Sequence, residues 1–519
     1  IAAEDIQDIQ FKHYWGENKH PEFLLGYQDI PEQQAQLPLT VDFNDCGHIL
    51  VVGSPGYGKS TFIQNALIDV MRKTTPEQSH IYLYDFGTSG LISLVDFPHV
   101  ADYFTADDNE KVMKSLRRLQ KEVKLRKAAL SEARSSNMQQ YNRDAGTPFP
   151  SLFIAIDSFD GVSDATFSEA FNETVNILAR EGASLGICLI TTMSRFNAMR
   201  VQLQANFKTK IALYLFEQSD VTSIVGRTDQ VLLDIRGRGL MKQDTVVSFQ
   251  VCVPYAVEDN SSMIQQVKAE AQEMSRYWTG ALPQPIPMLP EVVTPEMVEA
   301  QVDRSERNHQ VLLGLTREMV EVAAFTLDKA ISLVSDNVRS VTQFYKVLAY
   351  QLQQYTTPVQ VVIVDPLGLV PLDQFKEAHR FSDTLSAKEG MNIILDNLKE
   401  RMAQPGEYTQ SLIIIPDIQI LGQSLNITEN QFKELLLEGP KYGITPVFVG
   451  NYKDLMTNYS TLVTLHRQLT TQVFMGMRIS DQEYVRFPYI SNEKSPRPNE
   501  GYIVDAEGYE FVQLMSIEE

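Results

Sequence analysis

Short, nearly continuous runs of apolar residues recur along this chain, with longer helical stretches between them. In the first half these runs lie at 47–52, 81–85, 152–157, 185–190 and 210–214. Such runs, rich in Val and Ile, are typical of parallel strands that are buried on both faces. Stretches such as 108–131 and 164–182 are expected to be helices. The alternation predicts an α/β fold with a largely parallel central sheet and right-handed crossovers.

The second half repeats this order of signals. Its apolar runs lie at 330–334, 361–365, 412–417, 442–448 and 471–474. Three pairs of landmark residues keep their order and have similar separations: Gly26 with Gly314, Asp85 with Asp365, and Asp157 with Asp417. Repeated order of this kind indicates a tandem duplication of one domain. The alternative is two unrelated α/β domains that share only a fold class.

A proline-rich stretch separates the two halves. Residues 282–290 read Leu-Pro-Gln-Pro-Ile-Pro-Met-Leu-Pro. Because proline lacks an N–H donor and favours extended backbone, this stretch predicts a stiff linker. A chain of 519 residues also exceeds the roughly 250–300 residues that one hydrophobic core supports. We therefore expect a first domain over 1–280, a linker over 281–300 and a second domain over 301–519.

Residues 53–60 have the P-loop pattern, directly after an apolar strand and before an expected helix at 61–72. The loop contains Gly53, Ser54, Pro55, Gly56, Tyr57, Gly58, Lys59 and Ser60, with Thr61 beside it. Its glycines allow backbone N–H groups to surround phosphates, and the helix N-terminus adds partial positive charge. We expect Lys59 to reach the β- and γ-phosphates of ATP and Ser60 to ligate Mg²⁺. The alternative is a glycine turn followed by Lys-Ser by chance.

The apolar strand at 152–157 ends in Asp157, as a Walker B strand does. This Asp is the candidate catalytic residue and a candidate Mg²⁺ ligand, usually through water. Hydrolysing relatives place Glu next, where it orients or deprotonates the attacking water. Here the next residue is Ser158, whose hydroxyl is a poor base, so the site is expected to bind ATP and hydrolyse it slowly. The alternative is that Asp160 or another acid substitutes for the missing Glu.

Two further polar pairs follow in the first half. Thr191 and Thr192 end an apolar strand, where a hydroxyl either senses the γ-phosphate or caps the strand. Arg236 and Arg238 lie in the sequence Ile-Arg-Gly-Arg-Gly-Leu. They either face the phosphates of a neighbouring subunit or belong to a solvated turn, which is the more common role for a single arginine.

The second half lacks the residues that bind phosphate. Aligning 330–334 with the strand before the P-loop puts Ser335 at Gly53, Ser340 at Gly58 and Val341 at Lys59, and leaves Thr342 as the hydroxyl. Loss of the lysine removes the main positive charge, and loss of the glycines prevents close backbone approach. The neighbouring Asp336 adds repulsion, and Asp417 again lacks a following Glu. The second domain is expected to bind nucleotide poorly or not at all, which leaves protein recognition as its natural role.

The net charge of −21 disfavours nucleic acid as a partner, because such binding replaces phosphate counterions with Lys and Arg. The three cysteines, Cys46, Cys188 and Cys252, have no CxxC spacing, which favours a reducing compartment over disulfides or zinc. No run of 18 apolar residues is present. The chain begins with Ile and has no signal peptide, so we expect a piece of a longer protein with membrane segments outside it.

These motifs resemble those of one family over nearly the whole chain. They are the P-loop at 53–60, Asp85, Asp365-Pro366, the sequence Ala-Asn-Phe-Lys-Thr-Lys-Ile at 205–211, Gly-Arg-Gly-Leu-Met at 237–241 and Glu-Gly-Tyr-Ile at 500–503. With the proline-rich linker, they resemble the C-terminal tandem ATPase modules of FtsK/SpoIIIE-type ATPases of type VII secretion systems, the EssC/EccC family. The resemblance implies two RecA-like P-loop domains.

The resemblance also implies a function. It implies the cytosolic part of a membrane-anchored bacterial motor, with transmembrane helices and a further ATPase module upstream. In such proteins the later modules bind ATP and Mg²⁺, hydrolyse weakly and regulate the first module. The last module docks secreted WXG100-like helical-hairpin proteins, and a homo-hexamer places ATP between subunits. Two alternatives stay open: an FtsK-like DNA translocase, which the charge disfavours, and a scaffold in which ATP is structural.

Overall fold

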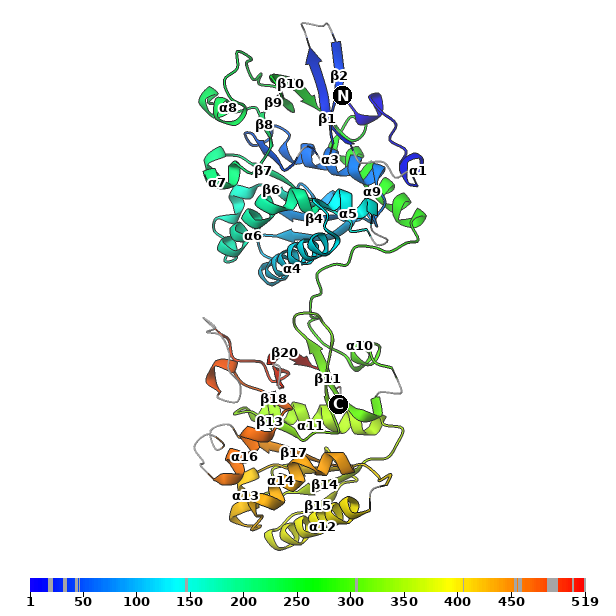
Figure 1. Ribbon diagram of the computed structural model, residues 1–519, viewed down its shortest axis with the longest axis vertical. Coiled ribbons are helices and arrows are strands. Elements are labelled where there is room, and N and C mark those ends of the chain that lie inside the picture. The colour runs from blue at the N-terminus through cyan, green and yellow to red at the C-terminus, as the bar shows by residue number, and fades with distance from the viewer. Residues whose placement is uncertain are drawn as a thin grey trace. The chain divides into compact units, whose positions relative to one another are not determined.

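The computed structural model describes most of the chain in two compact units, Ile1–Ile286 and Pro287–Glu519 (Figure 1). The described residues are 1–16, 22–30, 35–42, 45, 47–144, 148–303, 307–404, 406–451, 455, 460–482, 493–505 and 508–517. Cys46 lies outside these ranges, whereas Cys188 and Cys252 are buried free thiols. No helix in the described ranges is long and apolar enough to cross a membrane.

The first unit is built on a ten-stranded sheet in the order β2-β1-β10-β9-β8-β3-β7-β6-β4-β5. Its strands are β1 (Glu22–Ile30), β2 (Ala35–Asp42), β3 (Ile49–Val52), β4 (Ser79–Asp85), β5 (Val100–Thr105), β6 (Ser151–Asp157), β7 (Ile187–Met193), β8 (Thr209–Leu213), β9 (Arg238–Lys242) and β10 (Val246–Val251). Its helices include α1 (Phe11–Tyr14), α3 (Lys59–Lys73), α4 (Asn109–Ala133), α5 (Met138–Asp144), α6 (Ser168–Glu181), α7 (Val201–Gln204), α8 (Gln218–Val225) and α9 (Asn260–Tyr277).

The second unit repeats this order strand for strand, as β12-β11-β20-β19-β18-β13-β17-β16-β14-β15. Its strands are β11 (Gln310–Thr316), β12 (Val322–Thr326), β13 (Ile331–Val334), β14 (Gln360–Val364), β15 (His379–Phe381), β16 (Ser411–Ile415), β17 (Ile444–Gly450), β18 (Val473–Met475), β19 (Glu500–Val504) and β20 (Tyr509–Leu514). Its helices include α10 (Pro295–Glu299), α11 (Val338–Gln354), α12 (Thr384–Ala403), α13 (Ile418–Gln423), α14 (Glu429–Leu437) and α16 (Thr461–Leu469). The matching topology supports the predicted duplication.

Each sheet has a parallel part and an antiparallel part. Strands β8, β3, β7, β6, β4 and β5 pair in parallel. The pairings β8–β9, β9–β10, β10–β1 and β1–β2 are antiparallel. The predicted α/β class with two largely parallel sheets is confirmed. The antiparallel extension was not predicted, because a strand such as β10 alternates half-buried and buried residues and lacks a continuous apolar run.

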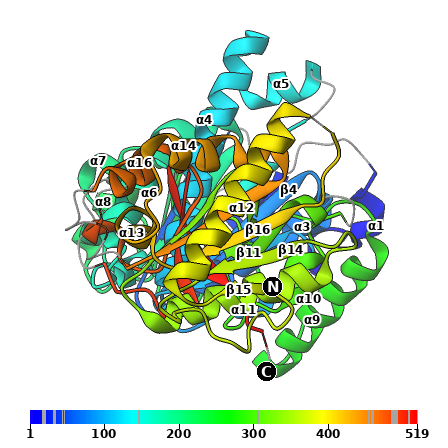
Figure 2. The ribbon, with the colours of Figure 1, turned by 90° about the horizontal axis from the view of Figure 1, so that it is seen from below.

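Helices cover both faces of each sheet and bury alternate residues of its strands. In the first unit Ile49 and Val51 face α3 and α9, whereas Leu50 and Val52 face α4, α6 and α8. In the second unit α11 packs on one face, and α12, α13, α14 and α16 pack on the other. Figure 2 shows α12 lying across the strands of its sheet. This burial on both faces explains the continuous apolar runs of the parallel strands.

The landmark glycines Gly26 and Gly314 occupy equivalent β-bulges. The register of β1 against β2 shifts at Gly26, and that of β11 against β12 shifts at Gly314. A Cβ atom on Gly26 would overlap the carbonyl oxygen of Gln250, and one on Gly314 would overlap that of Gln513. Both positions therefore require glycine because the adjacent strand passes too close for a side chain.

The proline-rich stretch is divided between the two units. Its first part packs on the first unit, where Arg118 donates to the carbonyls of Gln284 and Pro285. Its later part belongs to the second unit, where Leu289 packs against the core cluster that contains Val293 and Val298. The boundary between the units falls after Ile286.

Candidate nucleotide site and its counterpart

The P-loop of the first unit joins β3 to α3 through residues 53–58. Gly56 and Gly58 have φ values of +83° and +99°, which residues other than glycine rarely adopt. A Cβ atom on Gly53 would lie only 2.8 Å from the Cβ of Leu213. The three glycines therefore serve the turn and the close packing of this loop against β8, as the motif predicts.

Lys59 begins α3 and is buried. Its Nζ donates to the carbonyls of Gly53 at 2.8 Å and Ser54 at 3.1 Å, so it crosses the loop. Burial lowers the pKa of Lys59, while the negative charges of Asp157 and Asp160 oppose that shift. A buried ammonium group with only carbonyl partners is well placed to exchange them for an anion.

Asp157, at the carboxyl end of β6, contacts hydroxyl groups from α3 and β7. It accepts hydrogen bonds from the hydroxyls of Ser60, at 2.7 Å, and Thr192. Burial raises the pKa of this carboxyl group, whereas the hydrogen bonds from Thr192 and Ser60 lower it. Thr192 also accepts from the N–H of Ser158 at 2.9 Å. Thr191 is fully buried, and its hydroxyl has no hydrogen-bond partner within the described ranges.

Ser158 and Asp160 follow on the same edge of the sheet. Ser158 has φ +60°, and its Oγ lies 2.6 Å from the place that a Cβ on Gly87 would take. The Ser158 side chain therefore packs against the loop after β4. Asp160 is half-buried and accepts from the N–H of Ser194 at 3.1 Å. The negative charges of Asp157 and Asp160 both act on Lys59.

The loop after β4 is a part of this site that sequence reasoning did not assign. Asp85 accepts from the N–H of Leu91 at 2.8 Å, and the Nε2 of Gln64 donates to the carbonyl of Gly90. A Cβ on Gly90 would lie 2.8 Å from the Ser60 hydroxyl and 3.3 Å from an Asp157 carboxylate oxygen. Gly87 and Gly90, which follow Asp85 in the sequence, could have indicated that this loop lies close to other backbone or side chains.

The segment that carries the two arginines packs against the P-loop. The N–H of Gly237 donates to the carbonyl of Tyr57 at 3.1 Å, and the Tyr57 hydroxyl donates to Asp234 at 2.6 Å. Arg236 is exposed and Arg238 is half-buried. A role for either arginine toward a neighbouring subunit stays a prediction.

The same place in the second unit is built differently. β13 ends at Val334 and α11 begins at Val338, so only residues 335–337 form the loop. The Ser335 hydroxyl donates to the carbonyl of Gly476 at 2.8 Å, and Asn337 caps the helix through the N–H of Arg339. The segment that would correspond to the end of the P-loop is wound into α11 here. This turn offers no glycine-rich cradle and no lysine.

The remaining polar residues of this counterpart have local partners. Thr342, which the sequence aligns with Ser60, donates its hydroxyl to the carbonyl of Val338 at 3.0 Å in the same helix. Asp417 does not take the place of Asp157, contrary to the pairing that the sequence predicts: the strand register puts Pro416 at the position of Asp157 and Asp417 at that of Ser158. Asp417 caps α13 through the N–H of Gln419 at 2.9 Å. Because β17 pairs with β13 as β7 pairs with β3, Val449 stands where Thr192 stands in the first unit.

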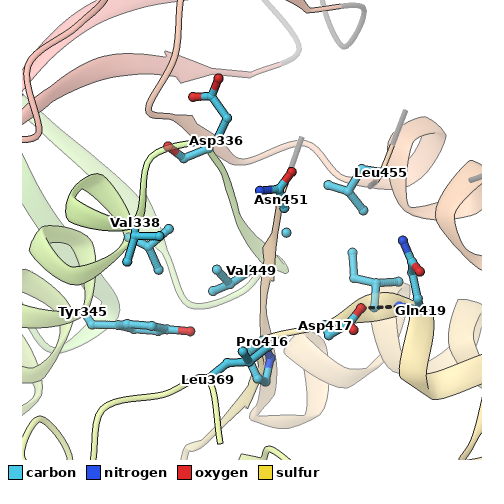
Figure 3. Close-up of a pocket in the computed structure, with 14 residues that line it drawn as sticks. Asp336, Val338, Tyr345, Leu369, Pro416, Asp417, Gln419, Val449, Asn451 and Leu455 are labelled. Carbon is cyan, nitrogen blue, oxygen red and sulfur yellow. Dashed lines mark hydrogen bonds between the residues drawn. The ribbon is translucent and has the colours of Figure 1, made fainter. Parts of the chain in front are cut away.

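A pocket of about 290 Å³ lies at this counterpart (Figure 3). Its described lining consists of Ser335, Asp336, Val338, Val341, Tyr345, Leu369, Pro416, Asp417, Ile418, Gln419, Val449, Gly450, Asn451 and Leu455. The fold and these two sites together define a tandem pair of P-loop NTPase domains, one with an intact loop and one with an altered loop.

The comparisons with known proteins agree with this class. Residues 12–242 match the FtsK/SpoIIIE family. The chain is 32% identical over 516 residues to type VII secretion system protein EssC of Staphylococcus aureus (strain NCTC 8325 / PS 47), covering 99% of this chain and 35% of that protein. It is 28% identical over 516 residues to ESX secretion system protein YukB of Bacillus subtilis (strain 168), covering 96% and 34%.

Two solved structures are similar over nearly the whole chain. One is EssC (ATPases 2 and 3) from Geobacillus thermodenitrificans, with 25% identity, a TM-score of 0.82 and 96% coverage of both chains. The other is Thermomonospora curvata EccC (ATPases 2 and 3) in complex with a signal sequence peptide, with a TM-score of 0.59 and coverage of 97% and 95%. At 18% identity the second likeness shows the fold alone.

The chain therefore belongs with the FtsK/SpoIIIE-type ATPases of type VII secretion systems, the EssC/EccC family, and corresponds to their tandem ATPase domains. It spans about a third of the length of the curated relatives that it matches.

Proposed function

We propose that this chain is the ATP-binding and substrate-recruiting part of a type VII secretion motor. The observation that carries the nucleotide half is the group formed by Lys59, Ser60, Asp157 and Thr192 beneath an intact P-loop. Backbone N–H groups of the loop and the start of α3 would hold the phosphates. Lys59 would exchange its two carbonyl partners for the β- and γ-phosphates. Its charge then neutralises theirs without any large movement of the backbone.

The oxygen donors at this site fit Mg²⁺. Ser60 and Asp157 supply a hydroxyl and a buried carboxylate, the hard ligands that Mg²⁺ prefers. Bound Mg²⁺ would neutralise phosphate charge. The hydroxyl of Thr192 holds Asp157 from the other side and fixes its orientation. We propose Gly53 to Thr61 as the nucleotide-binding residues, and Ser60 and Asp157 as the residues that hold the metal.

Slow hydrolysis is the expected behaviour of this first unit, because Ser158 stands where a catalytic Glu is expected. Ser158→Glu should raise ATP turnover by about tenfold or more, since a positioned general base contributes at least that much. Steady-state phosphate release from the full chain measures this. Ser158→Gln is the matched control, because it has the same size without the carboxylate, and it should leave turnover low. Equal turnover of wild type and Ser158→Glu would mean that Ser158 is not the limiting defect.

The second half of the proposal is that the second unit recognises a peptide. The argument for it is that the first unit holds a peptide segment of its own chain on the equivalent surface. There the chain's own residues 284–286 pack beside β5 and α4. Arg118 donates to the carbonyls of Gln284, at 2.6 Å, and Pro285, at 2.9 Å. The N–H of Ile286 donates to Asp102 at 2.9 Å, and the Ile286 side chain is buried in the core cluster below α4. This surface thus binds an extended, proline-flanked segment.

The equivalent surface of the second unit has a pocket of about 280 Å³. Helices α4 and α12 correspond through their N-caps, Asp108 and Asp383. They also correspond through Arg126 and Arg401, which donate to the equivalent carbonyls of Leu185 and Tyr442. The pocket is lined by Gln360, Val362, His379, Phe381, Gly390, Ile393, Ile394, Asn397, Ser411, Ile413 and Ile444. On this correspondence Ile393 replaces Arg118 and His379 replaces Asp102. No described residue of the second unit is anchored there as Ile286 is in the first.

The equivalent surface of the first unit holds residues 284–286, so the largely apolar pocket of the second unit is suited to a similar segment of another protein. This supports recruitment of a secreted protein through an apolar signal. The related Thermomonospora curvata structure is of a complex with a signal sequence peptide, which agrees with this role for the fold. We propose that the partners are WXG100-like helical-hairpin proteins that insert a large apolar side chain.

Replacement of Ile393 tests this pocket. Ile393 is 57% exposed, so Ile393→Arg should leave the fold intact while it puts a charge at the mouth of an apolar pocket. We expect binding of a WXG100-like substrate to the full chain to weaken by about tenfold or more, as loss of an apolar anchor does. Fluorescence anisotropy with a labelled substrate measures this. Leu385→Arg, at an 80% exposed position of the same helix outside the pocket lining, is the matched control. Equal weakening by both variants would contradict the proposal.

The remaining parts of the proposal concern the whole machine. We propose functional domains over 1–280 and 301–519, assembly as a homo-hexamer, and attachment to the cytoplasmic face of a bacterial membrane through segments outside this sequence. The net charge of −21 supports a protein partner over nucleic acid. Salt-dependent binding of duplex DNA by the full chain would instead favour the DNA-translocase alternative.

A further inference from the structure

A row of three aromatic rings begins at the P-loop of the first unit. The ring centroids of Tyr57, in the loop itself, and Tyr214 lie 4.5 Å apart, with 30° between the ring planes. Tyr214 in turn meets Phe216 nearly edge to face, with centroids 5.5 Å apart. Both tyrosines are half-buried, whereas Phe216 is 78% exposed. The row therefore ends in a large apolar ring that the described part of the fold leaves uncovered.

Backbone hydrogen bonds hold this row against the phosphate-binding loop. Tyr214 directly follows β8, and its carbonyl accepts from the N–H of Ser54 at 2.8 Å. The Tyr57 hydroxyl donates to Asp234 at 2.6 Å, and the Tyr57 carbonyl accepts from the N–H of Gly237 at 3.1 Å. The loop, the end of β8 and the segment before β9 are thus tied together. The rings therefore keep a fixed position beside any phosphate that the loop binds.

The order of the strands places the rings on the opposite side of the P-loop from the metal ligands. The strand before the loop, β3, lies between β7 and β8. Asp157 on β6 and Thr192 on β7 meet Ser60 on one side, so the γ-phosphate and Mg²⁺ are expected there. A nucleoside triphosphate is elongated, and its base lies at the far end from the γ-phosphate. The rings after β8 stand on the side toward which that base would extend.

The second unit, whose loop lacks the phosphate-binding residues, has a different side chain in the place of the exposed ring. Ala212 and Met475 are equivalent, because each pairs with the last residue of the strand before its loop. Phe216 stands four residues after Ala212, and Ile479 stands four residues after Met475. Ile479 is 0% exposed and belongs to the core cluster of its unit. The exposed ring thus accompanies the intact P-loop, and a buried aliphatic side chain accompanies the altered one.

We propose that Phe216 binds the base of the nucleotide by stacking, and that Tyr57 and Tyr214 hold its ring in place. This assignment rests on the proposed function, because it takes the P-loop as the site of the triphosphate. Nucleobases stack on exposed aromatic side chains through their π-faces, and each such contact adds affinity. The first unit would then bind the two ends of ATP on separate surfaces, the phosphates on the loop and the base on Phe216.

Two ligands separate the base from the phosphates. Mg-ATP has both, whereas Mg-tripolyphosphate has the phosphates alone, and each is titrated calorimetrically into the full chain. Phe216→Ala should weaken ATP binding by about fivefold or more, as removal of a stacking aromatic side chain does. The same variant should bind tripolyphosphate with unchanged affinity. Phe216→Tyr keeps an aromatic ring at this position and should bind both ligands as the wild type does.

Leu125→Ala is the matched control for loss of an exposed apolar side chain. Leu125 is 55% exposed on α4, outside the described nucleotide site, so both affinities should stay at the wild-type values. The proposal is overturned if Phe216→Ala binds ATP as tightly as the wild type. It is also overturned if that variant loses affinity for both ligands equally, since the ring would then only support the loop. Binding of both ligands that survives Lys59→Ala would contradict the proposed function instead.

Discussion

Lys59→Ala is expected to weaken the binding of Mg-ATP to the full chain by about a hundredfold or more. Hydrogen bonds to charged groups contribute roughly 1.5–3 kcal/mol each, and Lys59 is placed to make two such bonds to phosphates. Their combined loss corresponds to at least two factors of ten in affinity. Competitive titration against a fluorescent ATP analogue measures the change directly.

Val341→Ala is the matched control in the second unit. Val341 aligns with Lys59, but its side chain belongs to an apolar wall, so nucleotide affinity should not change. Thermal unfolding of both variants establishes that each retains the fold. Unchanged affinity in Lys59→Ala, or a comparable loss in Val341→Ala, would show that the nucleotide site has been assigned to the wrong unit.

Gly314→Ala is expected to destabilise the second unit by at least about 3 kcal/mol, a value at the severe end for single substitutions. The added methyl group would overlap the carbonyl oxygen of Gln513 on the adjacent strand β20. Because that neighbour is backbone, rotation of a side chain cannot relieve the overlap, and the pairing of β11 with β20 would have to shift. Guanidinium-induced unfolding of the full chain, followed by circular dichroism, measures the loss.

Two glycine variants serve as references. Gly26→Ala places a methyl group against Gln250 in the equivalent bulge of the first unit and should have a similarly large effect there. Gly406→Ala meets nothing closer than the Tyr408 ring at 3.9 Å and should change stability little. A Gly314→Ala protein as stable as Gly406→Ala would contradict the view that these landmark glycines mark equivalent bulges.

Much of the fold could be predicted because the parallel strands are buried on both faces. That burial produced the apolar runs at β3, β4, β6, β7 and β8 and their repeats in the second half. The antiparallel strands β2, β9 and β10 could not be found in this way. β2 has a single buried residue, β9 has a buried run of only three residues, and β10 alternates half-buried and buried residues. The P-loop was predictable because backbone geometry requires glycine at specific positions, and sequence records that requirement directly.

The rest of the sites depends on contacts between distant segments. The loop after β4 approaches Ser60 and Asp157 because Asp85 folds it back, and the glycines after Asp85 do not by themselves show which residues the loop approaches. In the second unit, alignment alone left Thr342 as the surviving hydroxyl, but α11 begins earlier and gives it a partner within the helix. The apolar pocket beside α12 takes residues from five different elements, so sequence spacing carried no sign of it.

The stoichiometry of bound nucleotide tests the central claim, that the first unit binds ATP and the second has turned to other ligands. Equilibrium dialysis of the full chain with labelled ATP and Mg²⁺ measures it. We expect saturation at one ATP per chain, with that binding abolished by Lys59→Ala. Saturation at two per chain, or one ATP retained in Lys59→Ala, would contradict the claim.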